Sequence, residues 1–299
     1  MLIHRVAVLI TSFNRRESTL KTLASLFHQQ NPDDIEVSVF LVNDGCTDGT
    51  GEAVRAEFPG VRILQGDGTL FWNGGMRMAF AAALQESFDA YLFLNDDTML
   101  YENALKCLID CAETKSKASN PAIVVGSTRS PLTGEHSYGG FYLRGKGLGI
   151  TLKKVPPSPS EIVECDTMNG NFVLIPRDIV EKVGNLDQRF RHQFADIDYG
   201  LRAKQAGFAV VIAPGYIADC SSNSPAGTWR DPGLSLRQRW KNLISPKGVP
   251  PREWFLFTRR HYGWRWIYYS LSPYTKTIVS SLFGYRNHQG INRPSSARS

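Results

Sequence analysis

The 299-residue sequence lacks any apolar run long enough to cross a membrane. The run near its start, residues 6–10, is far shorter than the ~20 apolar residues of a spanning helix, and no small-residue cleavage site follows it. The five cysteines form no CxxC pair and have no zinc-ligand partners at suitable spacing. We therefore expect neither a secretory signal nor a zinc site, but reduced thiols in a cytosolic protein.

Acidic residues are scarce in the last quarter of the chain. From Ala226 onward there are 13 Lys and Arg but 2 Asp and Glu, a net charge of +11, whereas residues 1–225 carry −5. Five of the six tryptophans also lie in this segment. The sequence therefore predicts a mildly acidic body, residues 1–225, followed by a basic aromatic helical tail, residues 226–299.

Short runs rich in Val, Ile and Leu alternate with segments of helical apolar spacing. Strands are predicted at residues 5–11, 35–42, 61–64, 90–94, 122–127 and 208–213, and helices at 18–29, 51–58, 74–87, 102–118, 178–183 and 196–206, with Ser18 as a plausible N-cap. Such alternation is typical of an α/β fold with a mostly parallel sheet between helices. A Gly-rich stretch at 139–149 predicts a hairpin.

Polar clusters follow three of the predicted strands: Thr11-Ser12-Phe13-Asn14, Asn43-Asp44-Gly45 and Asn95-Asp96-Asp97. Ligands of parallel α/β sheets bind at the carboxyl ends of strands, so three clusters in register indicate a site. Adjacent carboxylates suit a hard cation that bridges to diphosphate oxygens. The alternative for Asn95-Asp96-Asp97 is an Asx-turn or helix cap.

Five motifs in order resemble family 2 glycosyltransferases with the GT-A fold, the Rossmann-like fold of nucleotide-diphospho-sugar transferases. They are residues 6–15 (VAVLITSFNR), 42–50 (VNDGCTDGT), 93–98 (FLNDDT), 168–171 (MNGN) and 196–202 (DIDYGLR). The chain is similar to bacterial rhamnosyl- and galactofuranosyl-transferases of surface polysaccharide assembly, such as that of O-antigen. The resemblance implies a nucleotide-sugar half at residues 1–100 and an acceptor and catalytic-base half at 101–225.

The resemblance implies donor contacts on the first half of the chain. Asp44 matches the residue that contacts uracil or thymine, and the loop from Thr11 to Arg15 would wrap the base and ribose with Arg15 near phosphate. Asp97 matches a direct ligand of Mg²⁺ or Mn²⁺, while Asn95 stands where relatives carry the first acid. Asp96 would face the ribose or hold the loop.

A Gly- and Asn-rich donor loop of the relatives matches residues 66–75. In it Asp67 and Asn73 would contact the donor and Trp72 would stack on a sugar face, unless Trp72 is simply buried in a turn. Relatives often place a further His ligand near residues 217–222, where this chain has Asp219 and Cys220. Because an oxygen ligand suits Mg²⁺ better than a thiolate, we favour Asp219 as a metal ligand.

The acceptor side is expected on the second half of the body. Asp196 matches the catalytic base of the family, with helix capping as the alternative role, and Ala195 replaces the Glu that usually precedes it. An inverting transfer needs such a carboxylate to accept the proton of the attacking hydroxyl. The resemblance implies acceptor contacts by Asn169, Gly170, Asn171, Asp198 and Tyr199.

The tail interleaves Trp, Tyr and Arg, a composition that suits the surface of an anionic bilayer. Arg265 and Lys276 interrupt its apolar runs, which excludes a membrane span. A helical hairpin packed on the body or a contact between copies in a homo-oligomer are the alternatives. No nucleic-acid recognition motif is present, so no nucleic-acid partner is expected.

These observations predict an inverting, metal-dependent glycosyltransferase at the cytoplasmic face of a bacterial membrane. It would move a sugar from a UDP- or dTDP-sugar to a glycan or lipid-linked glycan acceptor in one in-line displacement. A nucleotidyltransferase of related fold is the first alternative, although the loop after the first strand lacks the Gly-rich basic sequence of that class. A non-catalytic nucleotide-sugar binding module is the second.

Overall fold

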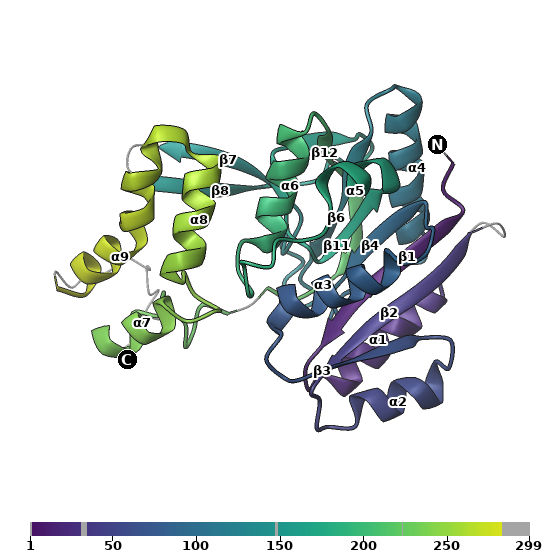
Figure 1. The fold of residues 1–299 in the computed structure, drawn as a ribbon, viewed down its shortest axis with the longest axis horizontal. Helices are drawn as coiled ribbons and strands as arrows, with labels where there is room; N and C mark the ends of the chain where they lie inside the picture. Colours follow the sequence, from purple (N-terminus) through teal and green to yellow (C-terminus); the bar gives the residue numbers. More distant parts are fainter. Residues whose placement is uncertain (1, 31–34, 147–148, 223, 283–299) are drawn as a thin grey trace, which may run out of the picture.

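The computed structural model of the protein describes residues 2–30, 35–146, 149–222 and 224–282. Figure 1 shows a large twisted sheet with helices on both faces and a group of helices from the end of the chain set to one side. The large sheet contains β1 (Arg5–Ser12), β2 (Glu36–Asp44), β3 (Arg62–Gly66), β4 (Ala90–Leu94), β5 (Met99–Leu100), β6 (Ala122–Arg129), β9 (Val163–Cys165), β11 (Phe172–Pro176) and β12 (Ala209–Asp219). A small sheet contains β7 (Gly140–Lys146), β8 (Gly149–Val155) and β10 (Thr167–Met168).

The strand order of the large sheet is β3-β2-β1-β4-β11-β6-β12-β5, with β9 paired to β12. Neighbours from β3 to β4 are parallel, as are β6 and β12, while β11 runs antiparallel between β4 and β6. The predicted mostly parallel sheet flanked by helices is confirmed. The antiparallel pairing of β7 with β8 likewise confirms the predicted hairpin.

Two hydrophobic cores lie on the two faces of this sheet. One face packs against α1 (Arg16–Phe27), α2 (Thr50–Glu57) and α4 (Ala104–Lys117); the other packs against α3 (Phe71–Ala83), α5 (Arg177–Val183) and α6 (Ala195–Gln205). Strand β1 contributes to both, because successive side chains of a strand point to opposite faces. Val8 enters the first core and Leu9 the second, and both are fully buried. Burial on both faces explains the unbroken apolar runs of the strands.

Among the element ends that differ from the predicted ones, three change the role expected of a side chain. Helix α1 begins at Arg16, so Ser18 lies inside it instead of capping it; Asp48 Oδ2 accepts a hydrogen bond from the Arg16 N–H at 2.9 Å. Helix α3 begins at Phe71, which places Trp72 on a helix. Strand β12 continues to Asp219, six residues beyond its predicted end.

The C-terminal helices are α7 (Leu236–Leu243), α8 (Pro251–His261) and α9 (Trp266–Leu282). Helix α8 lies between the body and α9: the Phe257 ring stacks on Phe194 at 5.3 Å, and the Trp254 indole donates to the Tyr269 carbonyl at 3.0 Å. One face of α8 is therefore part of the core of the body. For α8, the contacts agree with the alternative in which the tail packs on the body.

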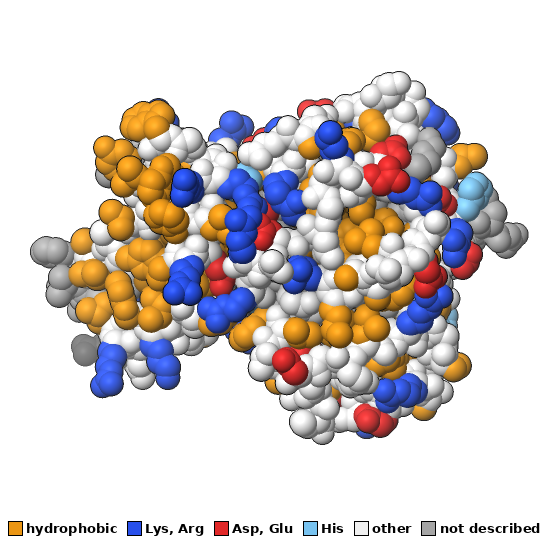
Figure 2. All heavy atoms as spheres, viewed as in Figure 1, with side chains coloured by type: hydrophobic (Ala, Val, Ile, Leu, Met, Phe, Trp, Pro, Cys, Tyr) orange, Lys and Arg blue, Asp and Glu red, His pale blue; other side chains and the backbone are white. Residues whose placement is uncertain are grey.

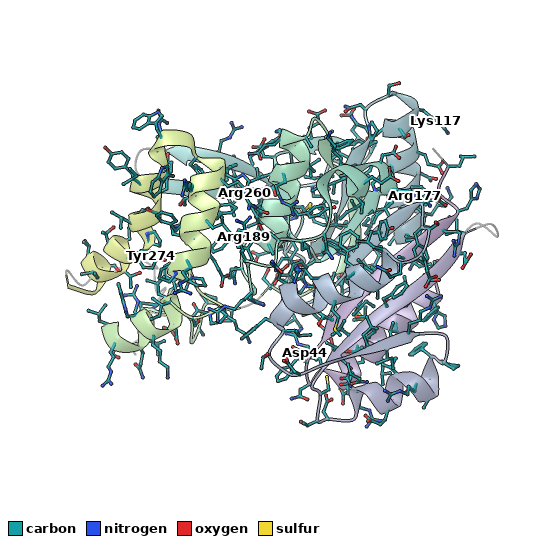
Figure 3. All side chains as sticks on the ribbon, in the orientation of Figure 1. Asp44, Lys117, Arg177, Arg189, Arg260 and Tyr274 are labelled. Atoms are coloured by element: carbon teal, nitrogen blue, oxygen red, sulfur yellow. The ribbon has the colours of Figure 1, made fainter. Side chains whose placement is uncertain are left out.

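A buried carboxylate joins α8 to α6. The Asp198 side chain is fully buried and accepts hydrogen bonds from Arg202 Nε at 2.9 Å, Arg260 Nη1 at 2.6 Å and His261 Nε2 at 2.8 Å. Arg260 also pairs with Asp187, and Figure 3 shows it near Arg189 at the junction of α8 with the body. Burial alone raises the pKa of Asp198, but these partners outweigh burial and hold it below its ordinary value.

Removing this anion should loosen the tail from the body. We expect Asp198→Asn to lower the free energy of unfolding in urea by about 3–5 kcal/mol, because Arg202 and Arg260, which are largely buried, lose their counter-ion. Since the folded pKa of Asp198 is lowered, its stabilisation is present above the unfolded value of ~3.9 and is lost as pH falls. The difference between the two proteins should therefore shrink in acid.

Asp110→Asn, which breaks the exposed pair with Lys106 on α4, is the matched control and should change stability negligibly. Equal effects of the two substitutions would contradict the role given to Asp198.

Candidate active site

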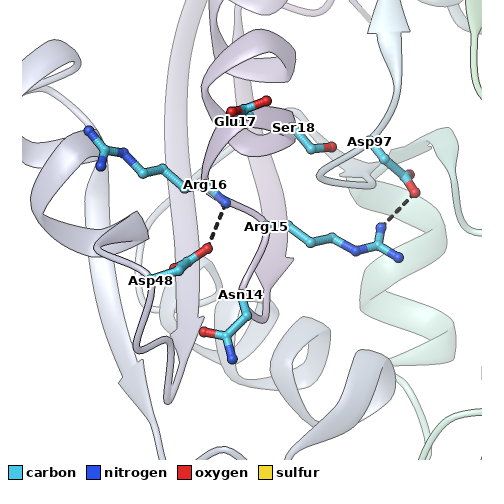
Figure 4. A pocket seen from close by; sticks show the side chains of 7 residues that line it. All are labelled: Asn14, Arg15, Arg16, Glu17, Ser18, Asp48 and Asp97. Atoms are coloured by element: carbon cyan, nitrogen blue, oxygen red, sulfur yellow. Dashed lines mark hydrogen bonds and ion pairs between the residues drawn. The ribbon is translucent and has the colours of Figure 1, made fainter.

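The polar clusters after β1 and β4 meet at one edge of the sheet and border a pocket of about 590 Å³. It is lined by Asn14, Arg15, Arg16, Glu17, Ser18, Asp48 and Asp97, and Figure 4 shows Arg15 reaching across it to Asp97. Cationic and acidic side chains thus face the same space. The pocket opens at the carboxyl ends of the parallel strands, where the sequence predicts a ligand site.

Arg15 pairs with the two acids that follow β4. Its Nη1 lies 2.6 Å from Asp97 Oδ2 and 3.2 Å from Asp96 Oδ1, and Ser18 Oγ donates to the Asp96 carbonyl at 2.7 Å. Burial raises the pKa of Asp96 to about 6, with Arg15 opposing the shift and Asp97 adding to it. Asp97 is the more accessible acid, with a side chain 33% exposed against 9% for Asp96.

The loop after β1 is held from beneath and leaves one aromatic ring free. Ser12 Oγ pairs with Thr19 Oγ1 at 2.8 Å, and Asn14 Oδ1 accepts from the Thr47 N–H at 2.7 Å while Asn14 adopts a left-handed φ of 52°. Phe13 is 54% exposed. A fixed loop with an exposed ring can offer a base a stacking surface.

Asp44 holds the segment that follows β3. Its two carboxylate oxygens accept from the Gly68 N–H at 2.8 Å and the Leu70 N–H at 3.2 Å, and its side chain is buried. A Cβ at Gly66 would lie 2.5 Å from Asp44 Oδ1, so this approach requires glycine. Asp67 is exposed and accepts two bonds from Thr69. Asp44 therefore shapes the loop that presents Asp67.

Trp72 connects the donor edge to the second half of the body. Its indole donates to Asn95 Oδ1 at 2.8 Å, and its ring packs edge-on against Phe93 at 6.3 Å. A Cβ at Gly170 would lie 2.5 Å from the Trp72 ring, so glycine alone lets the indole rest there. Asn95, which stands where relatives carry an acid, thus holds the Trp72 indole in place. Thr11 of β1 packs against Gly75 of α3, where an added Cβ would clash with the Thr11 hydroxyl.

Asp196 lies at the start of α6, directly beyond Gly170. Its Oδ2 accepts from the Gly170 N–H at 2.9 Å, its Oδ1 accepts from its neighbour Ile197 N–H at 2.8 Å, and the Asn169 side chain bonds it as well. Burial raises its pKa above the ordinary aspartate value in spite of these bonds. It remains half-buried and so open to a substrate. A carboxylate of raised proton affinity at a site edge suits a general base.

Comparison with known proteins agrees with this geometry. The model of the family described as "Glycosyl transferase family 2" matches residues 7–165, more than half of the chain. The chain belongs to this family. It is 25% identical over 248 residues, 76% of either chain, to the N-acetylglucosaminyl-diphospho-decaprenol L-rhamnosyltransferase of two Mycobacterium tuberculosis strains.

Solved structures show that the fold of this family 2 glycosyltransferase is GT-A. A mannosyltransferase from Pyrobaculum calidifontis, solved with GDP-Man and Mn²⁺, matches with a TM-score of 0.55 at 12% identity over 95% of this chain and 75% of that one. S. aureus TarS matches with a TM-score of 0.53 at 14% identity; 87% of this chain covers 44% of that chain. These likenesses concern the fold alone.

Three expected contacts of this glycosyltransferase are corrected by the structure. Asn73 is fully buried and its amide donates to the Asp187 carbonyl at 2.9 Å, so it holds the segment before α6 and does not face a donor. Asp198 and Tyr199 are also fully buried, Asp198 among its cations and Tyr199 against Phe93. Because neither side chain has any exposed surface, neither can touch an acceptor.

The residue beside Asp97 is Cys220, and not Asp219 as expected. Cys220 Sγ lies 3.5 Å from Asp97 Oδ1, and the Asn171 amide lies 3.5 Å from the same sulfur. Asp219 instead accepts from the Tyr101 hydroxyl at 2.6 Å and lies 3.5 Å from Arg129 Nε. Asp219 is the last residue of β12 and Cys220 follows it, and of the two side chains the sulfur is the one that lies next to Asp97. Burial raises the pKa of Cys220 to about 12, which keeps it a neutral thiol.

The residues fit a divalent cation only in part. Among residues 2–30, 35–146, 149–222 and 224–282 there is no group of three or more His, Cys, Asp or Glu that could hold a metal. Mg²⁺ needs fewer protein ligands, because one or two carboxylates suffice when substrate phosphates and water complete the octahedron. Asp97, which follows β4 and has a side chain 33% exposed, fits that arrangement. Two contacts escaped sequence reasoning: Ser18 with Asp96, and His192 Nδ1 at 3.4 Å from the Trp72 N–H.

The anchoring of Trp72 can be tested without a substrate. Asn95→Leu removes the acceptor of the indole N–H, whereas Asn95→Asp keeps one. We expect the leucine variant to lose about 1 kcal/mol of stability and to shift one indole N–H signal in a ¹⁵N–¹H spectrum, with the aspartate variant close to wild type. The Trp254 signal, whose partner is the Tyr269 carbonyl, is the internal control. Unchanged indole signals in Asn95→Leu would contradict the contact.

Proposed function

We propose that this family 2 glycosyltransferase inverts the anomeric centre of its donor and uses Asp196 as the catalytic base. One observation carries the proposal: the half-buried Asp196 carboxylate is held by the Gly170 N–H, beneath the indole that Asn95 ties to the donor edge. Base and donor edge are thereby fixed relative to each other. Rigid placement of the reacting groups is a large part of such catalysis.

The reaction is one displacement. The acceptor hydroxyl oxygen bonds to the anomeric carbon while the bond from that carbon to the diphosphate oxygen breaks, and the hydroxyl proton passes to Asp196. The nucleoside diphosphate leaves with both electrons of the broken bond. The burial that raises the pKa of Asp196 strengthens it as a proton acceptor. Arg15, at the mouth of the pocket, would pair with the departing diphosphate.

The donor is proposed to be a UDP- or dTDP-sugar. The buried Asp44 would contact the base next to the loop that it shapes. Phe13 would stack on the base, and Asp67 would face the ribose or the sugar. Trp72 would lie against the sugar, and Asn169 and Asn171 would face the acceptor. A bound Mg²⁺ or Mn²⁺ would stabilise negative charge on the leaving diphosphate. Asp97 would hold it.

The acceptor is proposed to be a lipid-linked glycan of a bacterial surface polysaccharide, met at the inner face of the membrane. The printed name of the mycobacterial relative describes rhamnosyl transfer to an N-acetylglucosaminyl-diphospho-lipid, and we propose rhamnose as the first sugar to test. The body, residues 1–225, would carry the reaction, with donor binding in its first hundred residues. The tail, residues 226–299, would provide the membrane contact.

Replacing the base should stop the chemistry and spare the donor. We expect Asp196→Asn to lower kcat about 10²- to 10⁴-fold, the usual contribution of a general base, with UDP affinity by calorimetry unchanged. Asp178→Asn is the matched control, an exposed acid in the first turn of the neighbouring helix α5. Normal turnover by Asp196→Asn would refute the assignment.

A panel of nucleotide sugars, assayed for nucleotide release with and without Mn²⁺, separates the alternatives. Pyrophosphate release from nucleoside triphosphates would indicate a nucleotidyltransferase, and binding without any turnover would indicate a binding module.

The pH dependence should report the same carboxylate. Because burial raises the pKa of Asp196, protonation should remove the base as pH falls, at a higher pH than for an ordinary aspartate of 3.8. We expect kcat/KM of the wild type to fall on the acid side with a midpoint above that value. The residual rate of Asp196→Asn should lack this limb. An identical acid limb in the variant would assign it to another group.

A further inference from the structure

Exposed apolar side chains are concentrated on the C-terminal helices. Of the sixteen large hydrophobic side chains that are exposed in the described residues, ten belong to residues 236–279: Leu236, Trp240, Ile244, Phe255, Trp264, Ile267, Tyr268, Leu271, Ile278 and Val279. Figure 2 shows several orange areas over the left part of the molecule, where Figure 1 places α7–α9. An apolar surface of this kind marks an interaction site.

Much of this surface is a single helical stripe. Tyr268, Leu271, Ile278 and Val279 are spaced by three, seven and one residues along α9, so they lie on one side of it; Ile267 lies beside them. The opposite side of α9 is buried and includes Tyr269 and Thr277. The stripe begins at Trp264, 74% exposed, and Phe255 of α8 joins it through an edge contact with Trp266 at 4.7 Å. We call Phe255, Trp264, Ile267, Tyr268, Leu271, Ile278 and Val279 the α9 face.

Basic residues border the α9 face, and exposed acids are missing from its two helices. Arg252 and Arg259 flank Phe255 on α8. Arg265 lies just before α9, and Lys276 lies on it. The acid of α8, Glu253, is 4% exposed and bound to Arg191. The Arg265 guanidinium lies over the Trp264 ring at 5.4 Å. The face is thus apolar at its centre and cationic at its rim.

We propose that the α9 face is a membrane-docking surface that binds a bilayer containing anionic lipids. Apolar groups would enter the headgroup and acyl boundary while the arginines and Lys276 pair with lipid phosphates. Among the described residues no helix has the length and hydropathy to span a bilayer, so the helix lies along the surface. The docking surface rests on the proposed function in one respect: its purpose would be to bring the site to a lipid-linked acceptor.

Charge decides between a lipid surface and a second copy of the chain. A symmetric contact between two α9 faces would bring two cationic rims together, without exposed acids on either helix to offset them. An anionic bilayer meets the same rim with opposite charge. Trp264 and Tyr268, the most exposed aromatic side chains of the face, combine an apolar ring with a polar group, as suits the headgroup level.

Vesicle sedimentation of the full chain tests the proposal. Vesicles of phosphatidylcholine with phosphatidylglycerol, and vesicles of phosphatidylcholine alone, contain no glycan acceptor, so binding does not depend on the proposed transfer. We expect binding to the anionic vesicles, weaker by about tenfold or more in Leu271→Glu. The pair Arg265→Gln and Lys276→Gln should weaken it on the order of tenfold and reduce its salt dependence.

Leu132→Glu is the matched control, because Leu132 is 89% exposed on the body, and it should bind like the wild type. All variants should keep the wild-type thermal unfolding and donor-dependent nucleotide release, which separates lost docking from misfolding and from failed chemistry. Binding that Leu271→Glu leaves intact would overturn the proposal. A dimer in sedimentation equilibrium that Leu271→Glu dissociates would overturn it in favour of a contact between copies.

Discussion

The ion cluster at Asp198 is the constraint on which the rest of the arrangement depends. A carboxylate without exposure is costly unless cations surround it, and two of its three partners, Arg260 and His261, come from α8. The same helix α6 carries Asp196 two residues earlier. The tail is therefore tied to the segment that presents the proposed base. This tie also sets the direction in which the α9 face points relative to the site.

A second chain of contacts links the residues after β4 to Asp196, the proposed base. It runs from Asn95 through the Trp72 indole to Gly170 and ends at the Asp196 carboxylate. Each link requires its residue type: an amide acceptor, an indole donor and a residue without a side chain. A methyl group added at Gly170, as in Gly170→Ala, would push the Trp72 indole away. The two halves of the body are thereby held in register by a few specific atoms.

Much of the fold could be predicted from the sequence, because apolar runs with period two or 3.6 residues report directly on strands and helices. Asp97 lines the pocket, as its position after a predicted strand suggested. The role of Asp196 was implied by the family motif and stays a prediction. The failures have one cause. Asn73, Asp198 and Tyr199 lie within motifs that hold functional residues, but their direction depends on tertiary packing that a motif does not encode. Likewise the extension of β12 to Asp219 decided that Cys220 faces Asp97.

The late position of α8 in the chain has a consequence for biosynthesis. A ribosome releases Asp198 and Arg202 well before Arg260 and His261, so the emerging body has one of the three partners of this carboxylate. Until α8 has been made, Asp198 lacks the other two partners and the helix that carries them. Synthesis of α8 then supplies both. The segment that carries the proposed base therefore gains its full set of buried contacts only after most of the chain has left the ribosome.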